Sequence, residues 1–294
     1  MFTLPTASTA TVSASIDLSE SQILAMAANC SHDAEKLALL KSIDLNGRML
    51  ALSVWQGTRS STRYIPIKLE NGRIVWISDP MRAGNSKVAP AAWLFDLPAV
   101  ESCGNCESCE KTCYAVVQQW QYLWTLAKRS SNYWLALNHP DLLFALLDKQ
   151  LSKGSRNLCR PHASGEFFCQ NYVDMWEVLS NSHKNVNFWA YTKMENFLNF
   201  SAIDAASNFN LIRSFLPDGS LNYGEEDEIV ERCKAQNVPV CPYREKQPKE
   251  ARKHCAGNGR NGCKICMHAK HVGFVIHGSK KNARKRSSNR CNHK

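Results

Sequence analysis

The sequence predicts an α/β fold, in the form of a partial (β/α) barrel or an open parallel sheet. After Gly154, strand-like segments alternate with helical ones, and this alternation implies parallel pairing with right-handed crossovers. Of the 294 residues, 44% are hydrophobic, which is enough to bury a substantial core. Most of the 13 cysteines fall in two short-spaced groups, which adds the expectation that metal sites belong to the fold.

Residues 1–80 are expected to form an N-terminal α+β extension. Residues 1 to about 16, rich in Ser, Thr and Ala, are typical of a flexible lead. Apolar residues recur at helical spacing in SQILAMAANC and AEKLALLKSI, with Asp17 or Ser19 as the cap, which predicts one or two helices. Alternating apolar residues on both sides of Asn71-Gly72 then predict a small antiparallel sheet over residues 48–78.

Residues 81–232 are expected to hold the α/β core. The stretch from Met81 to Cys113 is predicted to be irregular, because glycine and proline punctuate it. Helices are then expected over YAVVQQWQYLWTLAKRSSNYWLAL and, after His139-Pro140, over DLLFALLDKQL. Strands are expected within NLCRPHASGEFF, NVNFWAYTK and FNLIRSFLP, and helices over QNYVDMWEVLSNS and MENFLNFSAIDAAS.

The carboxyl ends of the predicted strands are the expected location of a ligand, as in other α/β sheets. Polar residues gather at these positions, which places them near any such site, and His162, Tyr191 or Lys193 could contact a substrate or transfer a proton. They are His162, Ser164, Glu166, Tyr191, Thr192 and Lys193.

The first group of cysteines reads Cys103-Gly-Asn-Cys106-Glu-Ser-Cys109-Glu-Lys-Thr-Cys113. Four thiols in one short loop can converge on a single metal centre. Zinc prefers ligand pairs that a longer connection separates, whereas a compact loop is common for a 4Fe-4S cluster. The spacing therefore favours a 4Fe-4S cluster and leaves zinc as the alternative.

The second group of cysteines is looser and predicts a metal-binding module over residues 233–278. Its expected ligands, for zinc or for a second 4Fe-4S cluster, are Cys241, Cys255, Cys263 and Cys266. Cys233 could replace Cys241, and His254, His268 and His271 lie nearby as less favoured ligands. Four further cysteines stand apart and are expected to be inert or buried thiols: Cys30, Cys159, Cys169 and Cys291.

The net charge of +10 is concentrated at the C-terminal end. Residues 251–294 hold twelve of the 36 Lys and Arg and no Asp or Glu. Such a segment attracts DNA or RNA by counterion release, although a basic disordered tail over residues 279–294 that only confers solubility is equally compatible. The expected contacts to nucleic acid are Lys280, Lys281, Arg284, Lys285 and Arg286.

The expected compartment is the cytoplasm, without a membrane partner. No run of eighteen apolar residues occurs, and the N-terminus lacks the basic start and apolar stretch of a signal peptide. No carboxylate constellation typical of a metal-dependent nuclease is visible either. The oligomeric state is not indicated.

A combination of short motifs over about residues 82–278 resembles the phage "gene product 88" proteins. These motifs are GNSK at 84–87, CYA at 113–115, RPHASGEFF at 160–168, WAYTK at 189–193, and a terminal HC…CKIC segment that ends in FVIHG. The resemblance implies an origin in a phage or other mobile element and a core similar to the radical S-adenosylmethionine barrel.

The resemblance also implies roles for individual residues. Cys103, Cys109 and Cys113 would hold the cluster, and the turn Ser164-Gly165-Glu166 would meet the amino group of S-adenosylmethionine. Asn85 and Lys87 of the GNSK motif are further cofactor-binding candidates. The catalytic candidates are Glu166, His162, Tyr191 and Lys193.

The ligand spacing departs from the radical S-adenosylmethionine pattern. Those enzymes usually space their ligands as CxxxCxxC, whereas Cys106, Cys109 and Cys113 reverse the two gaps to C-x2-C-x3-C, with Cys103 as a fourth thiol before them. If all four thiols ligate, no iron stays open for the cofactor. The sequence thus supports two hypotheses, an iron-sulfur enzyme similar to radical S-adenosylmethionine proteins, and a non-enzymatic nucleic-acid-binding protein with structural metal sites.

Overall fold

The computed structural model describes residues 18–56, 64–68, 72, 74–85, 88–104, 113–195, 197–215, 235, 240–244 and 274–275. Within these ranges the chain has the mixed α/β fold that the sequence predicts. The helices are α1 (Glu20–Asn29), α2 (Asp33–Ser42), α3 (Leu45–Gln56), α5 (Tyr114–Gln121), α6 (Leu123–Asn138), α7 (Pro140–Ser152), α8 (Gln170–Ser182) and α9 (Ser201–Ala205). The strands are β1 (Tyr64–Lys68), β2 (Ile74–Ser78), β3 (Arg82–Asn85), β4 (Val88–Phe95), β5 (Leu158–Pro161), β6 (Asn187–Thr192), β7 (Phe209–Phe215), β8 (Val240–Arg244) and β9 (Phe274–Val275).

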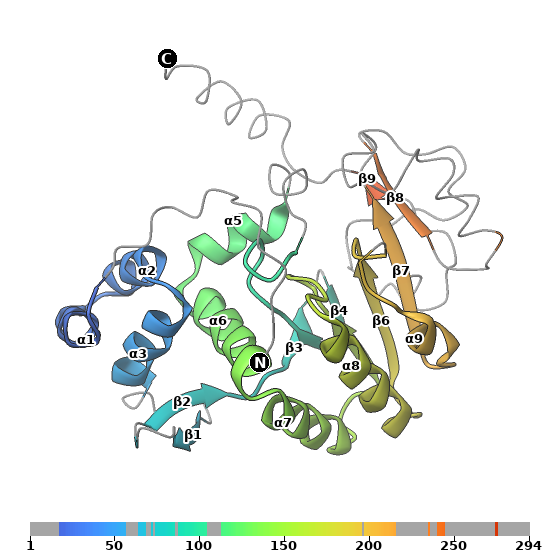
Figure 1. Ribbon diagram of the computed structural model, residues 1–294, viewed down its shortest axis with the longest axis horizontal. Coiled ribbons are helices and arrows are strands. Elements are labelled where there is room, and N and C mark those ends of the chain that lie inside the picture. The colour runs from blue at the N-terminus through green and yellow to red at the C-terminus, as the bar shows by residue number, and fades with distance from the viewer. Residues whose placement is uncertain are drawn as a thin grey trace, which may run out of the picture.

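The main sheet has the order β3-β4-β5-β6-β7-β8-β9, so its strands follow one another in space as they do in the chain. β3 pairs with β4 antiparallel, and every later pair is parallel. The predicted parallel pairing is therefore confirmed. Right-handed crossovers between sequential parallel strands place their helices on one face of a sheet, and α6, α7 and α8 lie together along one face in Figure 1.

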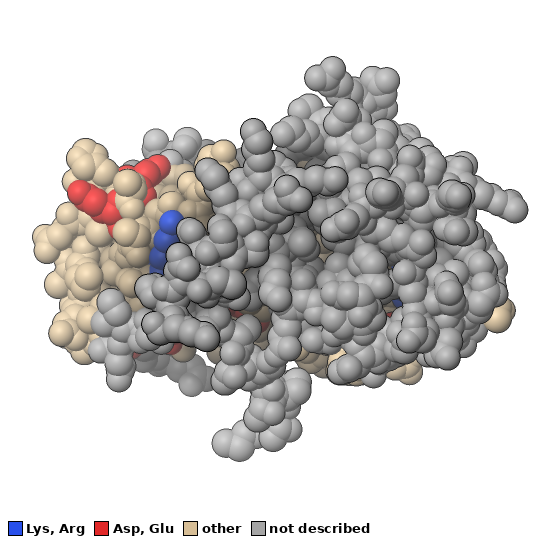
Figure 2. All heavy atoms as spheres, turned by 90° about the horizontal axis from the view of Figure 1, so that it is seen from above, with Lys and Arg blue, Asp and Glu red and all other residues tan. Residues whose placement is uncertain are grey.

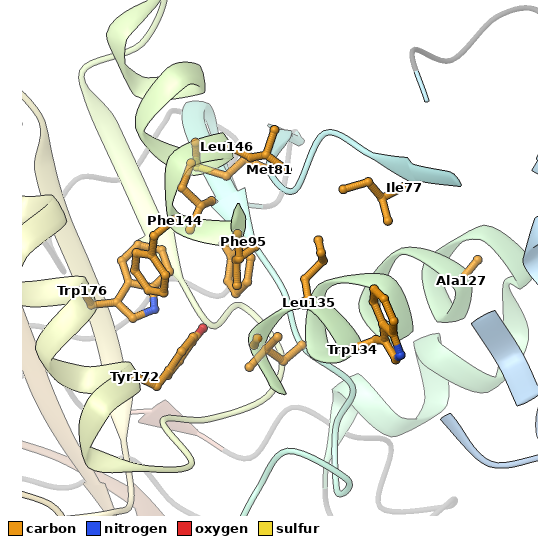
Figure 3. Close-up of a cluster of buried hydrophobic side chains, with 14 of the residues drawn as sticks. Ile77, Met81, Phe95, Ala127, Trp134, Leu135, Phe144, Leu146, Tyr172 and Trp176 are labelled. Carbon is orange, nitrogen blue, oxygen red and sulfur yellow. The ribbon is translucent and has the colours of Figure 1, made fainter. Parts of the chain in front are cut away.

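The main core lies between this helical layer and the sheet. Phe95, Phe188 and Leu211 face it from three strands, and Leu147 and Trp176 face them from α7 and α8. Figure 3 shows aromatic rings of α7, α8 and β4 gathered in this core. A second, smaller apolar cluster holds Ala92, Leu94, Leu158 and Trp189. Because side chains alternate between the faces of a strand, this cluster occupies the opposite face of the sheet.

The N-terminal helices follow the prediction at their start and depart from it later. Ser19 caps α1, since its hydroxyl accepts from the amide of Gln22 at 3.3 Å and its own amide donates to the Gln22 side chain at 2.8 Å. Residues 48–56 were predicted as a strand and instead lie in α3. The four consecutive residues Met49, Leu50, Ala51 and Leu52 are all buried there, and residues of these types favour helix over strand.

The structure corrects two other predictions and confirms a third. The stretch predicted as irregular contains β3 and β4, whose alanines and Pro90 give little indication of a strand. The helix predicted over 194–207 is limited to α9, because the chain turns at Met194 before it becomes helical. The predicted hairpin is confirmed over β1 and β2, which pair antiparallel from Tyr64 with Ser78 to Lys68 with Ile74.

None of the helices that the structure describes is both long and apolar enough to cross a membrane. On the face shown in Figure 2, the charged side chains of the described residues are seen mainly at the end where the N-terminal helices lie, and acidic ones are the more prominent there.

Candidate functional site

The loops that follow β4, β5 and β6 join one another at the carboxyl edge of the sheet. The amide of Leu97 donates to the Ser164 carbonyl at 2.9 Å, and the Ser164 hydroxyl donates back to the Leu97 carbonyl at 2.9 Å. The amide of Ala163 donates to the carbonyl of Phe95 at 3.3 Å. The turn after β5 is therefore bound to the loop after β4, which leads to the first cysteine.

Gly165 makes the closest approach between these two loops. A Cβ atom at this position would lie 2.5 Å from Leu97 Cβ and 2.6 Å from Ser102 Oγ, both shorter than van der Waals contact. Its φ of +84° also falls in the region that favours glycine. Only glycine therefore allows the predicted Ser164-Gly165-Glu166 turn to pack against the residue that precedes Cys103.

The described part of the first cysteine loop lies at this edge. Cys103 is half-buried and its amide donates to the Val100 carbonyl at 3.1 Å. A Cβ atom on Gly104 would lie 3.1 Å from Met194 Cε, so the loop also contacts the chain after β6. Cys113 is half-buried at the start of α5, whose backbone N–H groups favour a negative charge. Cys106 and Cys109 lie outside the described residues.

The N-terminal extension supports the same loop through Arg48. Its guanidinium donates to both carboxylate oxygens of Glu101 at 2.8 and 2.7 Å, and its Nε donates to the Leu40 carbonyl at 2.8 Å. The guanidinium also lies 5.7 Å from the ring centroid of Trp120 on α5. Arg48 is only 5% exposed, so this ion pair joins α3 to the loop two residues before Cys103 in a partly dehydrated setting.

Glu166 links the turn after β5 to the end of β6. Its Oε1 accepts from the amide of Phe167 at 2.8 Å, and its Oε2 accepts from the amide of Lys193 at 2.9 Å. Burial raises the pKa of this carboxyl to about 7, although hydrogen bonds from Lys193, Phe167 and Thr192 and the charge of Lys193 oppose the rise. The carboxyl can therefore exchange a proton near neutral pH.

Lys193 and Tyr191 lie on the end of β6, as predicted for the edge of the sheet. The Lys193 Nζ donates to the Ser214 hydroxyl on β7 at 3.2 Å. The Arg160 guanidinium lies over the Tyr191 ring at 5.4 Å. These contacts carry the polar network of Glu166 across β5, β6 and β7.

His162 lies deeper than the other predicted catalytic residues. Its ring is 4% exposed and packs against the rings of Phe95, Phe167 and Trp176 in the main core. Burial lowers the pKa of the imidazole to about 3, so the ring is neutral at physiological pH. With φ of 56°, His162 directs the chain from β5 into the Ser164-Gly165-Glu166 turn.

Two residues near the cysteine loop have no signal in the sequence. Burial raises the pKa of Tyr133 on α6 to about 12, and the nearby Glu101, Cys103 and Cys169 add to the rise. Arg48 is the other. Tyr133 lies in a segment whose apolar helical period explains it as an ordinary core position, and Arg48 lies in a segment predicted as part of a sheet, so only the three-dimensional fold brings them to the loop.

The remaining predicted ligands are mostly beyond the described residues. Among the residues that the structure describes, no three or more His, Cys, Asp or Glu side chains form a group that could hold a metal ion. The backbone of Cys241 is described in β8, where it pairs in register with Ser214 of β7. The backbone of Asn85 ends β3. Outside the described residues are Lys87, Cys255, Cys263, Cys266, Lys280, Lys281, Arg284, Lys285, Arg286, the alternative ligand Cys233, and His254, His268 and His271.

The packing of Gly165 predicts an asymmetry between two glycine substitutions. Gly154 also has positive φ, +64°, but nothing lies within 4 Å of its Cβ position. Gly154→Ala should therefore cost only backbone strain, about 1 kcal/mol. Gly165→Ala adds the overlap with Leu97 and Ser102, and should lower the free energy of unfolding by at least about 2 kcal/mol more. Urea denaturation of both variants tests this, and equal losses would contradict the close approach.

The raised pKa of Glu166 predicts a pH-dependent stability. The carboxyl binds its proton more tightly in the folded state, with a pKa of about 7, than in the unfolded state, at 4.5. Its contribution is therefore full below pH 4.5 and is lost as the pH rises through 7, by roughly 3 kcal/mol. In Glu166→Gln this fall should be missing when the unfolding free energies of variant and wild type are compared from pH 4.5 to 8. Parallel pH profiles would refute the assignment.

A protein family matches this chain. The family described as Gene product 88 matches residues 72–294, which is most of the chain and includes the turn, the cysteine loop and the basic C-terminus. Searches of curated proteins and of solved structures returned no match. The match begins before the first motif of the resemblance and extends to the end of the chain. Because the match spans well over half of the sequence, the chain belongs to the Gene product 88 family of phage proteins.

Proposed function

We propose that this phage protein is an iron-sulfur enzyme of the radical S-adenosylmethionine type, with a 4Fe-4S cluster held by the loop from Cys103 to Cys113. The observation that carries the proposal is the contact of Gly165 with Ser102. It brings the turn expected to meet the cofactor's amino group against the loop expected to hold the cluster. The order of strand, cysteine loop, helices, strand and Ser-Gly-Glu turn, followed by sequential parallel strands, supports the same proposal.

The described donors fit a cluster. Cys103 and Cys113 flank the loop, both are half-buried, and Cys113 stands at the positive end of α5. A bound cluster would supply one electron to reductive cleavage of S-adenosylmethionine. Cys109 would be the third ligand, and Cys106 decides whether one iron stays open for the cofactor.

The protein's own residues would orient the cofactor. Two backbone amides and the Thr192 hydroxyl donate to the Glu166 carboxylate, whose oxygens offer about four lone-pair sites, so it could still accept from the cofactor's amino group. The two amides hold this carboxylate at the ends of β5 and β6. Lys193, Tyr191 and the side chains of Asn85 and Lys87 remain candidates for contacts to the cofactor or the substrate. His162 would support the turn from within the core.

The cluster is tested by purifying the full chain without oxygen. The protein should be brown and should contain about four iron and four sulfide ions per cluster. Cys103→Ala and Cys113→Ala should remove the charge-transfer absorbance of that cluster. Cys30→Ala and Cys159→Ala serve as controls, because the half-buried Cys30 of the N-terminal extension and the buried Cys159 of β5 are not in the loop. Colourless protein that holds only zinc would contradict the proposal.

Further measurements of the same preparations separate the finer possibilities. Reductive formation of 5′-deoxyadenosine distinguishes an enzyme from a protein that only carries a cluster. Retention of this activity in Cys106→Ala would mean that three thiols suffice and one iron is open. The same metal analysis identifies the metal of the proposed second site at Cys241, Cys255, Cys263 and Cys266. Iron in excess of the first cluster would indicate a second iron-sulfur cluster, and zinc in addition to that iron would indicate a zinc site.

The charge distribution favours a second candidate function, a non-enzymatic nucleic-acid-binding protein with structural metal sites. Its supporting observation is the absence of Asp and Glu from residues 251–294, which carry twelve Lys and Arg. In this proposal the metal centres stabilise the fold and the basic segment contacts phosphates. Binding of nucleic acid by the basic segment is also compatible with the proposed enzyme, if nucleic acid is its substrate.

Removal of the basic tail tests the proposed binding. A chain that ends at Gly278 should bind DNA or RNA more weakly, and its affinity should depend less steeply on salt because fewer counterions are released. Fluorescence anisotropy with a labelled oligonucleotide at several salt concentrations measures both effects. A matched variant in which Lys280, Lys281, Arg284, Lys285 and Arg286 become Gln keeps the length of the chain. Unchanged affinity and salt slope in both would refute the role of the tail.

A further inference from the structure

A tyrosine and a histidine form a hydrogen-bonded pair inside the core next to the candidate site. The hydroxyl of Tyr172 on α8 lies 3.0 Å from Nε2 of His162. Both side chains are buried, at 2% and 4% exposure. In Figure 3 the Tyr172 hydroxyl points into the aromatic cluster that Phe95, Phe144 and Trp176 form around it.

The direction of this hydrogen bond follows from burial. A buried hydroxyl proton needs an acceptor, and His162 Nε2 is the acceptor within reach. Since burial keeps the imidazole neutral, one ring nitrogen carries a lone pair. The proton then resides on Nδ1, which has no hydrogen-bond partner among the described residues. Tyr172 therefore donates to His162.

Aromatic rings connect this pair to the first cysteine loop. Phe168 stacks on Tyr172 with ring centroids 4.5 Å apart, and Tyr133 meets Phe168 edge-on at 5.4 Å. Tyr133 in turn lies within electrostatic reach of Cys103. The path from the loop to the Tyr172 hydroxyl thus passes through rings that touch one another.

We propose that Tyr172 and His162 form a redox-active pair that supplies an electron to the cysteine site through Phe168 and Tyr133. The pair extends the proposed iron-sulfur function and rests on it for its natural oxidant, a hydroxyl radical, which peroxide would form together with hydroxide by taking one electron from a bound cluster. The oxidant takes one electron from Tyr133, and Tyr172 then transfers one electron to the oxidised Tyr133. The phenolic proton of Tyr172 moves to His162 Nε2 in the same step.

The products are a neutral tyrosyl radical and an imidazolium, so the single positive charge left by the electron resides on His162. An oxidised phenol is a far stronger acid than a buried imidazolium, so the proton transfer is favourable even though burial lowers the pKa of His162. A low-molecular-weight thiolate later returns one electron and leaves as a thiyl radical, and the proton on His162 goes back to Tyr172. The net effect is that a thiol, rather than the cluster, reduces the oxidant.

Photo-oxidation of the full-length protein tests the pair without any need for a cluster. Flash-generated ruthenium(III) tris-bipyridine removes one electron, and electron paramagnetic resonance follows the resulting radicals. The wild type should accumulate a long-lived tyrosyl radical whose formation slows in D2O, because the proton moves with the electron. Tyr172→Phe should lose this signal, whereas Tyr122→Phe should keep it, since Tyr122 is 60% exposed and outside the path.

A second variant covers the case in which Tyr172→Phe misfolds. His162→Asn retains a residue type that tolerates the positive φ at this position and removes the imidazole base. Its radical should be short-lived and insensitive to D2O. Equal lifetimes and isotope effects in wild type and His162→Asn would overturn the proposal. A cluster-bearing protein without the long-lived radical would refute only the pair, and a long-lived radical in colourless protein would refute only the proposed cluster.

Discussion

The candidate site depends on the absence of a side chain at residue 165. The space that a Cβ atom would need there is filled by Leu97 and Ser102. Because of this approach, the two loops exchange the hydrogen bonds between Leu97 and Ser164, and Glu166 reaches the end of β6. The position of the first cysteine loop relative to the buried carboxyl is thus set by backbone packing, which is more rigid than contact between long side chains.

The sheet also relates the two groups of cysteines, which the sequence separates by more than a hundred residues. Glu166 accepts from the Lys193 amide, the Lys193 amine donates to Ser214, and the backbone of Ser214 pairs in register with that of Cys241. β8 and β9, from the range expected to be a separate metal-binding module, extend the same parallel sheet. A metal bound by Cys241 would therefore be attached to a strand of the main sheet and not to a separate module.

The sequence predicts the parallel half of the fold well, because local patterns coincide there with tertiary structure. The β5, β6 and β7 segments are apolar, and the helices between them have a clear period, so their order and direction follow from general rules. The prediction fails where tertiary contacts decide. Residues 48–56 alternate in polarity like a strand, but they form a helix that is buried on several sides. Ala92 has little intrinsic preference for a strand and lies in β4 because it packs in the smaller apolar cluster of the sheet.

The same distinction applies to the site. Ser164, Gly165, Glu166 and Lys193 lie together at the predicted edge because strand ends meet wherever a parallel sheet forms. His162 was expected at that edge too, and the left-handed turn at this residue takes its ring into the core instead. Arg48 and Tyr133 could not be foreseen, since their role comes from the packing of helices far away in the sequence.

The Arg48–Glu101 ion pair shows that the sequence boundary of the family is not a physical boundary. The shared sequence begins at residue 72, after α1, α2 and α3 have ended. Yet α3 provides the buried guanidinium that neutralises Glu101 and covers Trp120 beside the cysteine loop. The environment of that loop is therefore set in part by an accessory segment, and a relative with a different N-terminus could hold the same loop in a different electrostatic field. Variation outside the shared region thus offers a way to adjust the chemistry of the site without changing any residue inside it.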